Sequence, residues 1–174
     1  MLTSLANPFM ATLVGFVLTA IIQSSSVTVS IVLLLASQGL LALPITLYII
    51  MGCNIGSCVT ALLASMAGKK DAKRAAMIHF LFNVIGTALM YVPLMLATNP
   101  IVDLIQSISA DNGRFVANAH TIIKVTQVIV LFPFANWIVK ILPQLALWKK
   151  KYFLKKTREE ASPIEEDYFA LYEE

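Results

Sequence analysis

Four long apolar blocks follow one another along the chain, and polar residues interrupt the first two. The first block, residues 7–37, is broken by residues 23–26, of sequence Gln-Ser-Ser-Ser. The whole block is longer than the about 20 residues of one untilted membrane span, whereas each half is shorter than a span. This pattern favours a re-entrant helical hairpin at about 8–38. The alternative is a single long, tilted helix with a polar stripe.

The second apolar block, at about 43–67, contains residues 52–57, of sequence Gly-Cys-Asn-Ile-Gly-Ser. Gly52 and Gly56 flank Asn54, an arrangement typical of a transmembrane helix that unwinds and exposes its backbone. The same glycines have the G-x-x-x-G spacing that lets two helices approach closely. The sequence therefore predicts a discontinuous helix, with a packing motif as the alternative.

The third and fourth blocks, at about 75–97 and 115–142, are each long enough to cross a bilayer. Between them, residues 98–114 are polar but carry apolar side chains at helical spacing, which predicts a short interfacial helix. A basic and acidic tail, 149–174, follows the membrane region, 1–148. We therefore expect an all-α integral membrane protein with a re-entrant hairpin, a discontinuous helix and two transmembrane helices.

Composition and charge support this interpretation. Of the 174 residues, 58% are hydrophobic and 13% are charged, whereas soluble domains average about 45–50% and about 25%. No Asp, Glu, Lys or Arg occurs in residues 1–68. A stretch of this length without charged side chains could not form the surface of a soluble domain. Four Lys or Arg residues lie in 69–74 and six in 149–158, against one in 98–114. The positive-inside rule therefore predicts a multi-pass protein of the cell (inner) membrane, with 69–74 and 149–174 in the cytoplasm.

The polar side chains at the two interruptions are the candidate binding groups. Hydroxyls of Ser and Thr can donate to an anion or present oxygen to a cation. In a hairpin, the start of the returning helix would add free amides and a positive dipole end, which together suit an anion. Asn54, Ser57 and Thr60 could add a second cluster from the other interrupted block. The alternative is that these hydroxyls bond helix carbonyls and hold helices together.

Two histidines each precede a polar residue by four positions, which places the pairs His79–Asn83 and His120–Lys124 on one helix face. An ionisable group inside a span is a candidate functional residue. For His79 the alternative is interhelical hydrogen bonding, and for Lys124 it is snorkelling to the membrane surface. A serine hydrolase with a histidine base would need a distinguished nucleophile, but the chain has no G-x-S-x-G elbow. We therefore expect no enzyme and no catalytic residue.

Several motifs resemble the type II sodium-phosphate cotransporters, whose bacterial members are often fused to a PhoU-like cytoplasmic domain. They are residues 23–26, 52–57 and 78–83, with further similarity at 117–121 and 132–134, and the resemblance covers about residues 8–143. The family contains two inverted copies of this unit, with the substrate between them. This chain resembles the second copy, and its tail ends where a PhoU-like domain would begin.

The resemblance implies sodium-coupled transport of inorganic phosphate by one repeat, which needs a first-repeat membrane partner or an oligomer. The implied phosphate-binding residues are Ser24, Ser25, Ser26 and Gln23. The implied sodium-binding residues are Gln23, Ser26, Thr28, Asn54, Ser57 and Thr60. Sodium would be the coupling ion and the sole metal, with no other cofactor and no nucleic-acid partner.

The sequence departs from the family pattern at two residue pairs, and the first of these departures bears on sodium coordination. Ser57-Cys58 stands where two threonines are usual, so one hydroxyl is lost, and Ile123-Lys124 stands where Phe-Asn is common. The alternative function is a non-transporting remnant, or an assembly or regulatory membrane subunit of a phosphate system.

Overall fold

The computed structural model describes residues 7–140, and every regular element in this part of the chain is a helix. The chain divides into two units, residues 1–135 and 136–174. The first unit contains all the elements that bear on the site, whereas only residues 136–140 of the second are described. The predicted tail, 149–174, and the last residues of the fourth apolar block lie outside the described residues.

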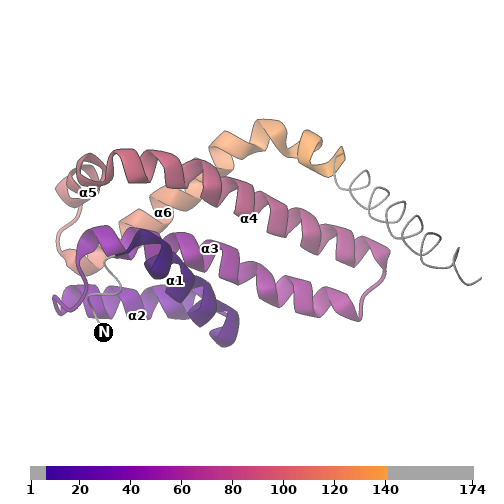
Figure 1. Ribbon diagram of the computed structural model, residues 1–174, viewed down its shortest axis with the longest axis horizontal. Helices are drawn as coiled ribbons and strands as arrows, with labels where there is room; N and C mark the ends of the chain where they lie inside the picture. The colour runs from indigo at the N-terminus through magenta and orange to yellow at the C-terminus, as the bar shows by residue number, and fades with distance from the viewer. Residues whose placement is uncertain (1–6, 141–174) are drawn as a thin grey trace, which may run out of the picture. The chain divides into compact units, whose positions relative to one another are not determined.

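The described helices match the predicted order of elements (Figure 1). They are α1 (Pro8–Ile22), α2 (Ser25–Ser37), α3 (Leu43–Met66), α4 (Lys70–Leu96), α5 (Thr98–Ser107), α6 (Asn112–Leu131) and the 3-10 helix η2 (Phe132–Phe134). Three helical stretches are long and apolar enough to cross a membrane, namely Leu43–Met66, Lys70–Leu96 and Asn112–Lys140. The described part of the chain is therefore all-helical and fits a membrane protein, and α5 confirms the predicted short helix between the last two candidate spans.

The first apolar block forms two short helices, which confirms the break at the polar run. Gln23 ends α1 in the left-handed conformation with a φ of 57°, and Ser24 caps α2 by accepting a hydrogen bond from the Val27 amide at 3.4 Å. Polar side chains that bond the backbone locally compete with helix continuation, which explains why α1 stops here. A re-entrant path of this pair through the membrane stays a prediction.

The predicted discontinuity of the second block is wrong, because α3 is one continuous helix from Leu43 to Met66. Its glycines serve close packing instead. A Cβ atom on Gly52 would lie 2.7 Å from the Phe16 backbone nitrogen, and one on Gly56 would lie 2.7 Å from the Phe16 carbonyl oxygen. The backbone of α1 therefore rests directly on α3, as the G-x-x-x-G alternative requires. Because this contact leaves the α3 hydrogen bonds intact, the helix has no reason to unwind.

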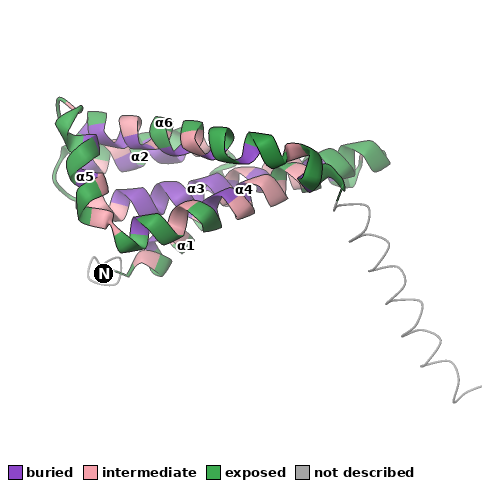
Figure 2. Cartoon of the chain, turned by 90° about the horizontal axis from the view of Figure 1, so that it is seen from above, coloured by how far each residue is buried: buried purple, intermediate pink, exposed green. Residues whose placement is uncertain are grey.

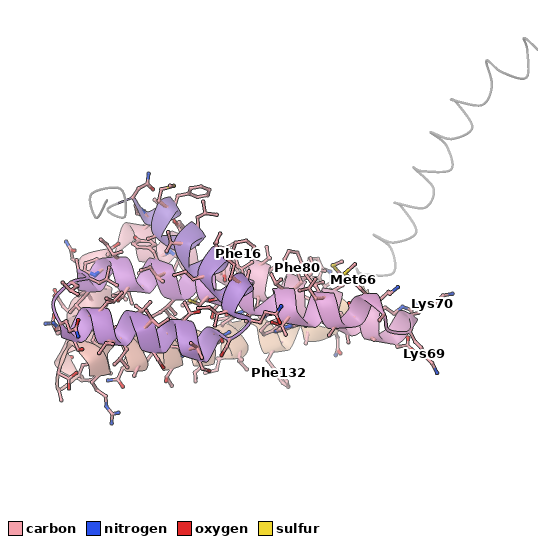
Figure 3. All side chains as sticks on the ribbon, turned by 90° about the horizontal axis from the view of Figure 1, so that it is seen from below. Phe16, Met66, Lys69, Lys70, Phe80 and Phe132 are labelled. Carbon is pink, nitrogen blue, oxygen red and sulfur yellow. The ribbon has the colours of Figure 1, made fainter. Side chains whose placement is uncertain are left out.

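α3 is the central helix of the first unit, and its first half is buried by α1, α2, α4 and α6 (Figure 2). A short turn at 67–69 returns the chain into α4, which packs along α3. The basic segment 69–74 belongs mostly to the first turns of α4, where Arg74 and Asp71 form an ion pair at 3.4 Å. Lys69 and Lys70 lie at the end of this helical hairpin, beyond Met66 (Figure 3).

Candidate functional site

The polar break between α1 and α2 lies against α3. The Thr60 hydroxyl on α3 donates to the Gln23 carbonyl oxygen at 3.5 Å. Two of the predicted sodium-binding residues, 37 positions apart in the sequence, are thus brought together. Hydroxyl and carbonyl oxygens at an interrupted helix are the ligand types that transporters use for small cations.

The serine run begins α2. Ser24 and Ser25 are half-buried, Ser26 is exposed, and Ser25 and Ser26 occupy the first turn of the helix. Thr28 is fully buried, and its hydroxyl donates to the Ser24 carbonyl oxygen at 3.2 Å, so it supports the turn from within. None of the hydrogen bonds among the described residues uses the hydroxyls of Ser25 and Ser26. These two hydroxyls are therefore available to a ligand beside the helix N-terminus.

Two other predicted site residues are used elsewhere in α3. The Ser57 hydroxyl donates to the Asn54 carbonyl oxygen at 2.7 Å, a bond within the helix. The Asn54 side chain is fully buried, and its Nδ2 donates to Oε1 of Gln127 on α6 at 3.4 Å. Asn54 therefore belongs to a different polar cluster from the serine run, and the hydrogen bonds of the structure do not join the two.

That second cluster, here called the amide cluster, consists of Asn54, Asn83 and Gln127. Gln127 Nε2 lies 3.2 Å from the Phe82 carbonyl oxygen and 3.5 Å from Asn83 Oδ1. Gly86 makes room for it, because a Cβ atom there would overlap the glutamine side chain. The three amides are 0%, 4% and 2% exposed, so their hydrogen bonds tie α3, α4 and α6 together away from lipid.

Sequence reasoning missed Gln127. A carboxamide inside an apolar span is a signal of interhelical hydrogen bonding, but its partner is 73 positions away in the sequence. Four buried polar atoms have no hydrogen-bond partner in the described part of the chain. They are Thr19 Oγ1, Asn54 Oδ1, Thr87 Oγ1 and His120 Nε2.

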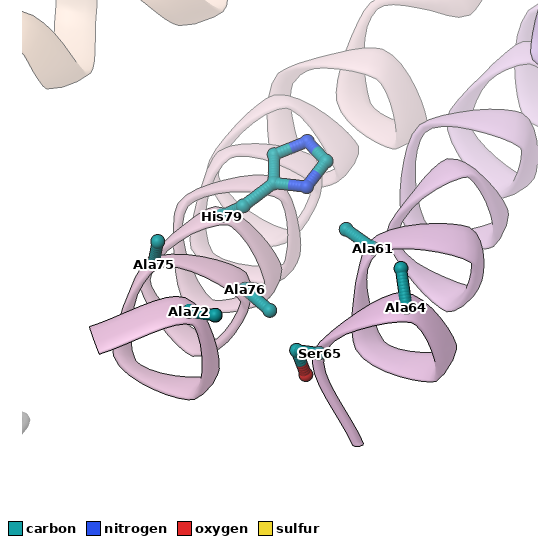
Figure 4. Close-up of a pocket in the computed structure, with 7 residues that line it drawn as sticks. All are labelled: Ala61, Ala64, Ser65, Ala72, Ala75, Ala76 and His79. Atoms are coloured by element: carbon teal, nitrogen blue, oxygen red, sulfur yellow. The ribbon is translucent and has the colours of Figure 1, made fainter. Parts of the chain in front are cut away.

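His79 contributes to helix packing through its backbone, whose carbonyl oxygen lies 3.0 Å from Asn83 Nδ2 and 3.8 Å from Cys58 Sγ. Its imidazole lines a groove of about 360 Å³ between α3 and α4, shown in Figure 4. The other lining residues are Ala61, Ala64, Ser65, Ala72, Ala75 and Ala76. This groove contains none of the predicted binding residues, and the hydrogen bonds of His79 give it no catalytic partner.

The described residues form a helical membrane protein whose candidate binding groups lie at a helix interruption. The family model for Na+/Pi-cotransporters matches residues 1–109, and the chain belongs to this family. The matched region includes α1 to α4 and both polar motifs. The resemblance to type II sodium-phosphate cotransporters is thereby confirmed, and a transporter family gives no support to the serine hydrolase alternative.

Relatives are found in bacteria and mammals. The chain is 35% identical over 126 residues to the uncharacterized protein YqeW of Bacillus subtilis, covering 72% of this chain and 40% of the relative. It is 35% identical over 120 residues to sodium-dependent phosphate transport protein 2C of Mus musculus, and the match covers 66% of this chain and 20% of the relative. It is 27% identical over 124 residues to the putative inorganic phosphate export protein YjbB of Salmonella typhimurium, and the match covers 71% of this chain and 22% of the relative. The chain thus spans well under half the length of these relatives, and no solved structure matches it.

Proposed function

We propose that this chain is one repeat of a transporter that carries inorganic phosphate, coupled to sodium, across the cell (inner) membrane. The observation that carries the proposal is the start of α2, where the hydroxyls of Ser25 and Ser26 are unused beside a helix N-terminus held against α3 by Thr60. Membership of the Na+/Pi-cotransporter family supports phosphate as the anion and sodium as the coupling ion.

Phosphate binds through the hydroxyls of the serine run and the first amides of α2. The N-terminus of a helix offers unpaired N–H groups and a positive dipole end, which favour an anion. Residues 1–68 carry no charged side chain, so the site attracts phosphate without a fixed ion pair. Neutral donors suit a carrier, because the anion must also be released on the other side of the membrane.

Sodium binds at the oxygen atoms around the break. The Gln23 carbonyl, the Thr60 hydroxyl and the Ser26 hydroxyl are the groups that we assign to it, with Gln23 positioning the phosphate as well. Thr28 acts through the helix turn, since its hydroxyl is bound to Ser24. Ser57 reaches a cation only by giving up its bond within α3.

The other half of the site comes from a second unit of the same kind. α1 and α2 are too short to cross a membrane in the way the three long helices do, which supports a re-entrant hairpin that ends inside the bilayer. In an inverted-repeat carrier two such tips meet around the substrate. We therefore assign this chain a first-repeat partner or an oligomer.

Uptake of labelled phosphate into proteoliposomes, with and without an inward sodium gradient, tests the proposal. The full chain should be reconstituted alone and with a first-repeat protein of the family. We expect sodium-stimulated uptake in the paired sample, reduced in the Ser25→Ala, Ser26→Ala double variant. Ser37→Ala, at the other end of α2, is the matched control. Absence of uptake from the paired sample would favour an assembly or regulatory role instead.

A further inference from the structure

The groove between α3 and α4 is lined mostly by methyl groups (Figure 4). It has a volume of about 360 Å³, and five of its seven lining residues are alanines. Ser65 adds no free donor, because its hydroxyl already donates to the Leu62 carbonyl oxygen at 2.8 Å. Four of the lining residues are exposed, namely Ala64, Ala72, Ala75 and His79. The groove is therefore open along its side, and its walls suit a hydrocarbon better than a polar ligand.

The groove runs from the turn at 67–69 into the apolar part of the candidate span Lys70–Leu96. From Ala72 to His79, the lining residue farthest from the turn, the helix advances about 10 Å. This length fits within one leaflet, since the hydrocarbon core of a bilayer is about 30 Å thick. An acyl chain that enters near the turn can therefore lie along the groove as far as His79.

A basic cluster lies at the end of the groove nearest the turn. Residues 69–74 contain four Lys or Arg and one Asp, a net charge of +3, and Asp71 is the sole acidic residue in 1–102. In the described part of the chain, Asp71 pairs with Arg74, and no ion pair uses the ammonium of a lysine in this cluster. These lysines are exposed, and they are Lys69, Lys70 and Lys73. Basic pockets between transmembrane helices, at the end predicted to face the cytoplasm, favour anionic lipid headgroups.

Two of these lysines are next to the groove. Residues three or four positions apart on a helix are neighbours on its surface. Lys69 is three positions before Ala72, and Lys73 is three positions before Ala76. Both alanines line the groove. The apolar walls are thus continuous with two cations at the membrane surface.

We propose that this groove binds an anionic phospholipid, with an acyl chain against the alanines and the headgroup phosphate held by Lys69 and Lys73. Small residues also line contacts between transmembrane helices, but a second copy of the chain in the same orientation would bring a second basic cluster to this end. Inorganic phosphate would neutralise the lysines and leave the apolar walls uncovered. A phospholipid matches both the charge and the walls, and its binding is independent of phosphate transport.

Thermal unfolding of the full chain in detergent tests the role of the lysines. Dioleoylphosphatidylglycerol is titrated into the wild type, the double variant Lys69→Gln, Lys73→Gln and the control Lys70→Gln, Arg74→Gln. The control removes two exposed charges that are three or four positions from none of the lining residues. A ligand that binds the folded state raises the unfolding temperature in a concentration-dependent way. We expect the apparent lipid affinity to fall by about 30-fold in the double variant, about fivefold for each lysine, and to stay near the wild-type value in the control.

A second comparison tests the apolar walls. Ala64→Leu adds a larger side chain to the wall of the groove and should abolish the rise in unfolding temperature with lipid. Ala88→Leu, at an exposed position of α4 outside the groove, should keep that rise. If Ala64→Leu does not fold, Ala61→Leu, which fills the groove from the preceding turn of α3, is measured in its place with the same expectation.

An equal rise with phosphatidylcholine of the same acyl chains would overturn the proposal, because the headgroup charge would then have no role. Equal losses in the two charge variants would also overturn it, since the lipid would then respond to the whole basic cluster. A rise with inorganic phosphate that Ala64→Leu leaves intact, without any rise with lipid, would identify an ion site instead. Unchanged unfolding with both ligands would leave the groove to a partner helix.

Discussion

Residues 24–28 carry neighbouring hydroxyls that have different roles. Ser24 accepts a hydrogen bond from the Val27 amide, and Thr28 donates to the Ser24 carbonyl, so both build the first turn of α2. The hydroxyls of Ser25 and Ser26 are used in none of the hydrogen bonds of the described chain. Ser24 and Thr28 build the turn, whereas the proposed anion ligands are Ser25 and Ser26, so substitution can separate an effect on stability from an effect on phosphate affinity.

Ser25→Ala should weaken phosphate binding in the assembled carrier by about 10- to 150-fold. This corresponds to the loss of one hydrogen bond to a charged ligand, worth about 1.5–3 kcal/mol. The unfolding temperature should stay near that of wild type, while Thr28→Ala should lower it. Equilibrium binding of labelled phosphate and thermal unfolding measure the two effects. Unchanged affinity in alanine variants of Ser24, Ser25 and Ser26 would exclude the serine run as the site.

Gln23 is the one non-glycine residue of the described chain with a positive φ. Left-handed backbone costs a residue with a Cβ atom about 1–2 kcal/mol, a cost that glycine avoids. Gln23→Gly should therefore leave the unfolding free energy unchanged or raise it by about 1 kcal/mol, yet lower sodium-driven uptake if the glutamine side chain positions the ligands. Gln38→Gly, at the end of α2 with a negative φ, is the control and should gain no stability. Full uptake by Gln23→Gly would make the side chain dispensable.

At the scale of helices, the contact of α1 with α3 positions the proposed binding groups. Gly52 and Gly56 bring the two backbones together, and Thr60, on the following turn of α3, reaches the end of α1. The alignment of the polar break therefore depends on two glycines that are not among the proposed ligands.

Gly52→Ala should destabilise the fold by about 1–3 kcal/mol, the usual effect of overpacking. The added methyl group would overlap the backbone of Thr12 and Phe16, so α1 must move away from α3. Displacement of α1 should also break the Thr60–Gln23 contact and reduce uptake. Denaturant unfolding in detergent measures the loss, and Ala88→Val, at an exposed position of α4, is the control. Wild-type stability of the Gly52 variant would show that α1 does not rest on α3.

The helices and their breaks were predictable where neighbouring residues in the sequence determine them. Four adjacent polar residues in an apolar block can form hydrogen bonds with the local backbone in place of the helical ones, and the helix breaks at that point. Residues 52–57 were ambiguous because glycine permits both an unwound backbone and the close approach of a second helix. Which of the two occurs depends on the packing of α1, which the local sequence does not specify. Gln127 shows the same limit, since its role follows from Asn54 on α3, which only the folded chain brings near.

At the scale of the whole protein, the charge distribution predicts its orientation in the membrane. The basic segment 69–74 is at the start of α4, and residues 98–114 follow its end. Because α4 has 27 residues, it is about 40 Å long and can place its two ends on opposite sides of the bilayer. The positive-inside rule assigns the start of α4 to the cytoplasm and α5 to the outside.

Cysteine labelling in intact cells tests this orientation. Ala72→Cys places a thiol at an exposed position in the first turn of α4, and Ser107→Cys places one at the exposed end of α5. The native Cys53 and Cys58 are buried. An impermeant maleimide should label Ser107→Cys from outside and should reach Ala72→Cys only after the membrane is made permeable. The two native cysteines should not react in either condition, which makes the wild type the control. Labelling of both positions from the same side would refute the orientation, because α4 could then not span the membrane, and the hairpin of α1 and α2 would lose its predicted side of entry.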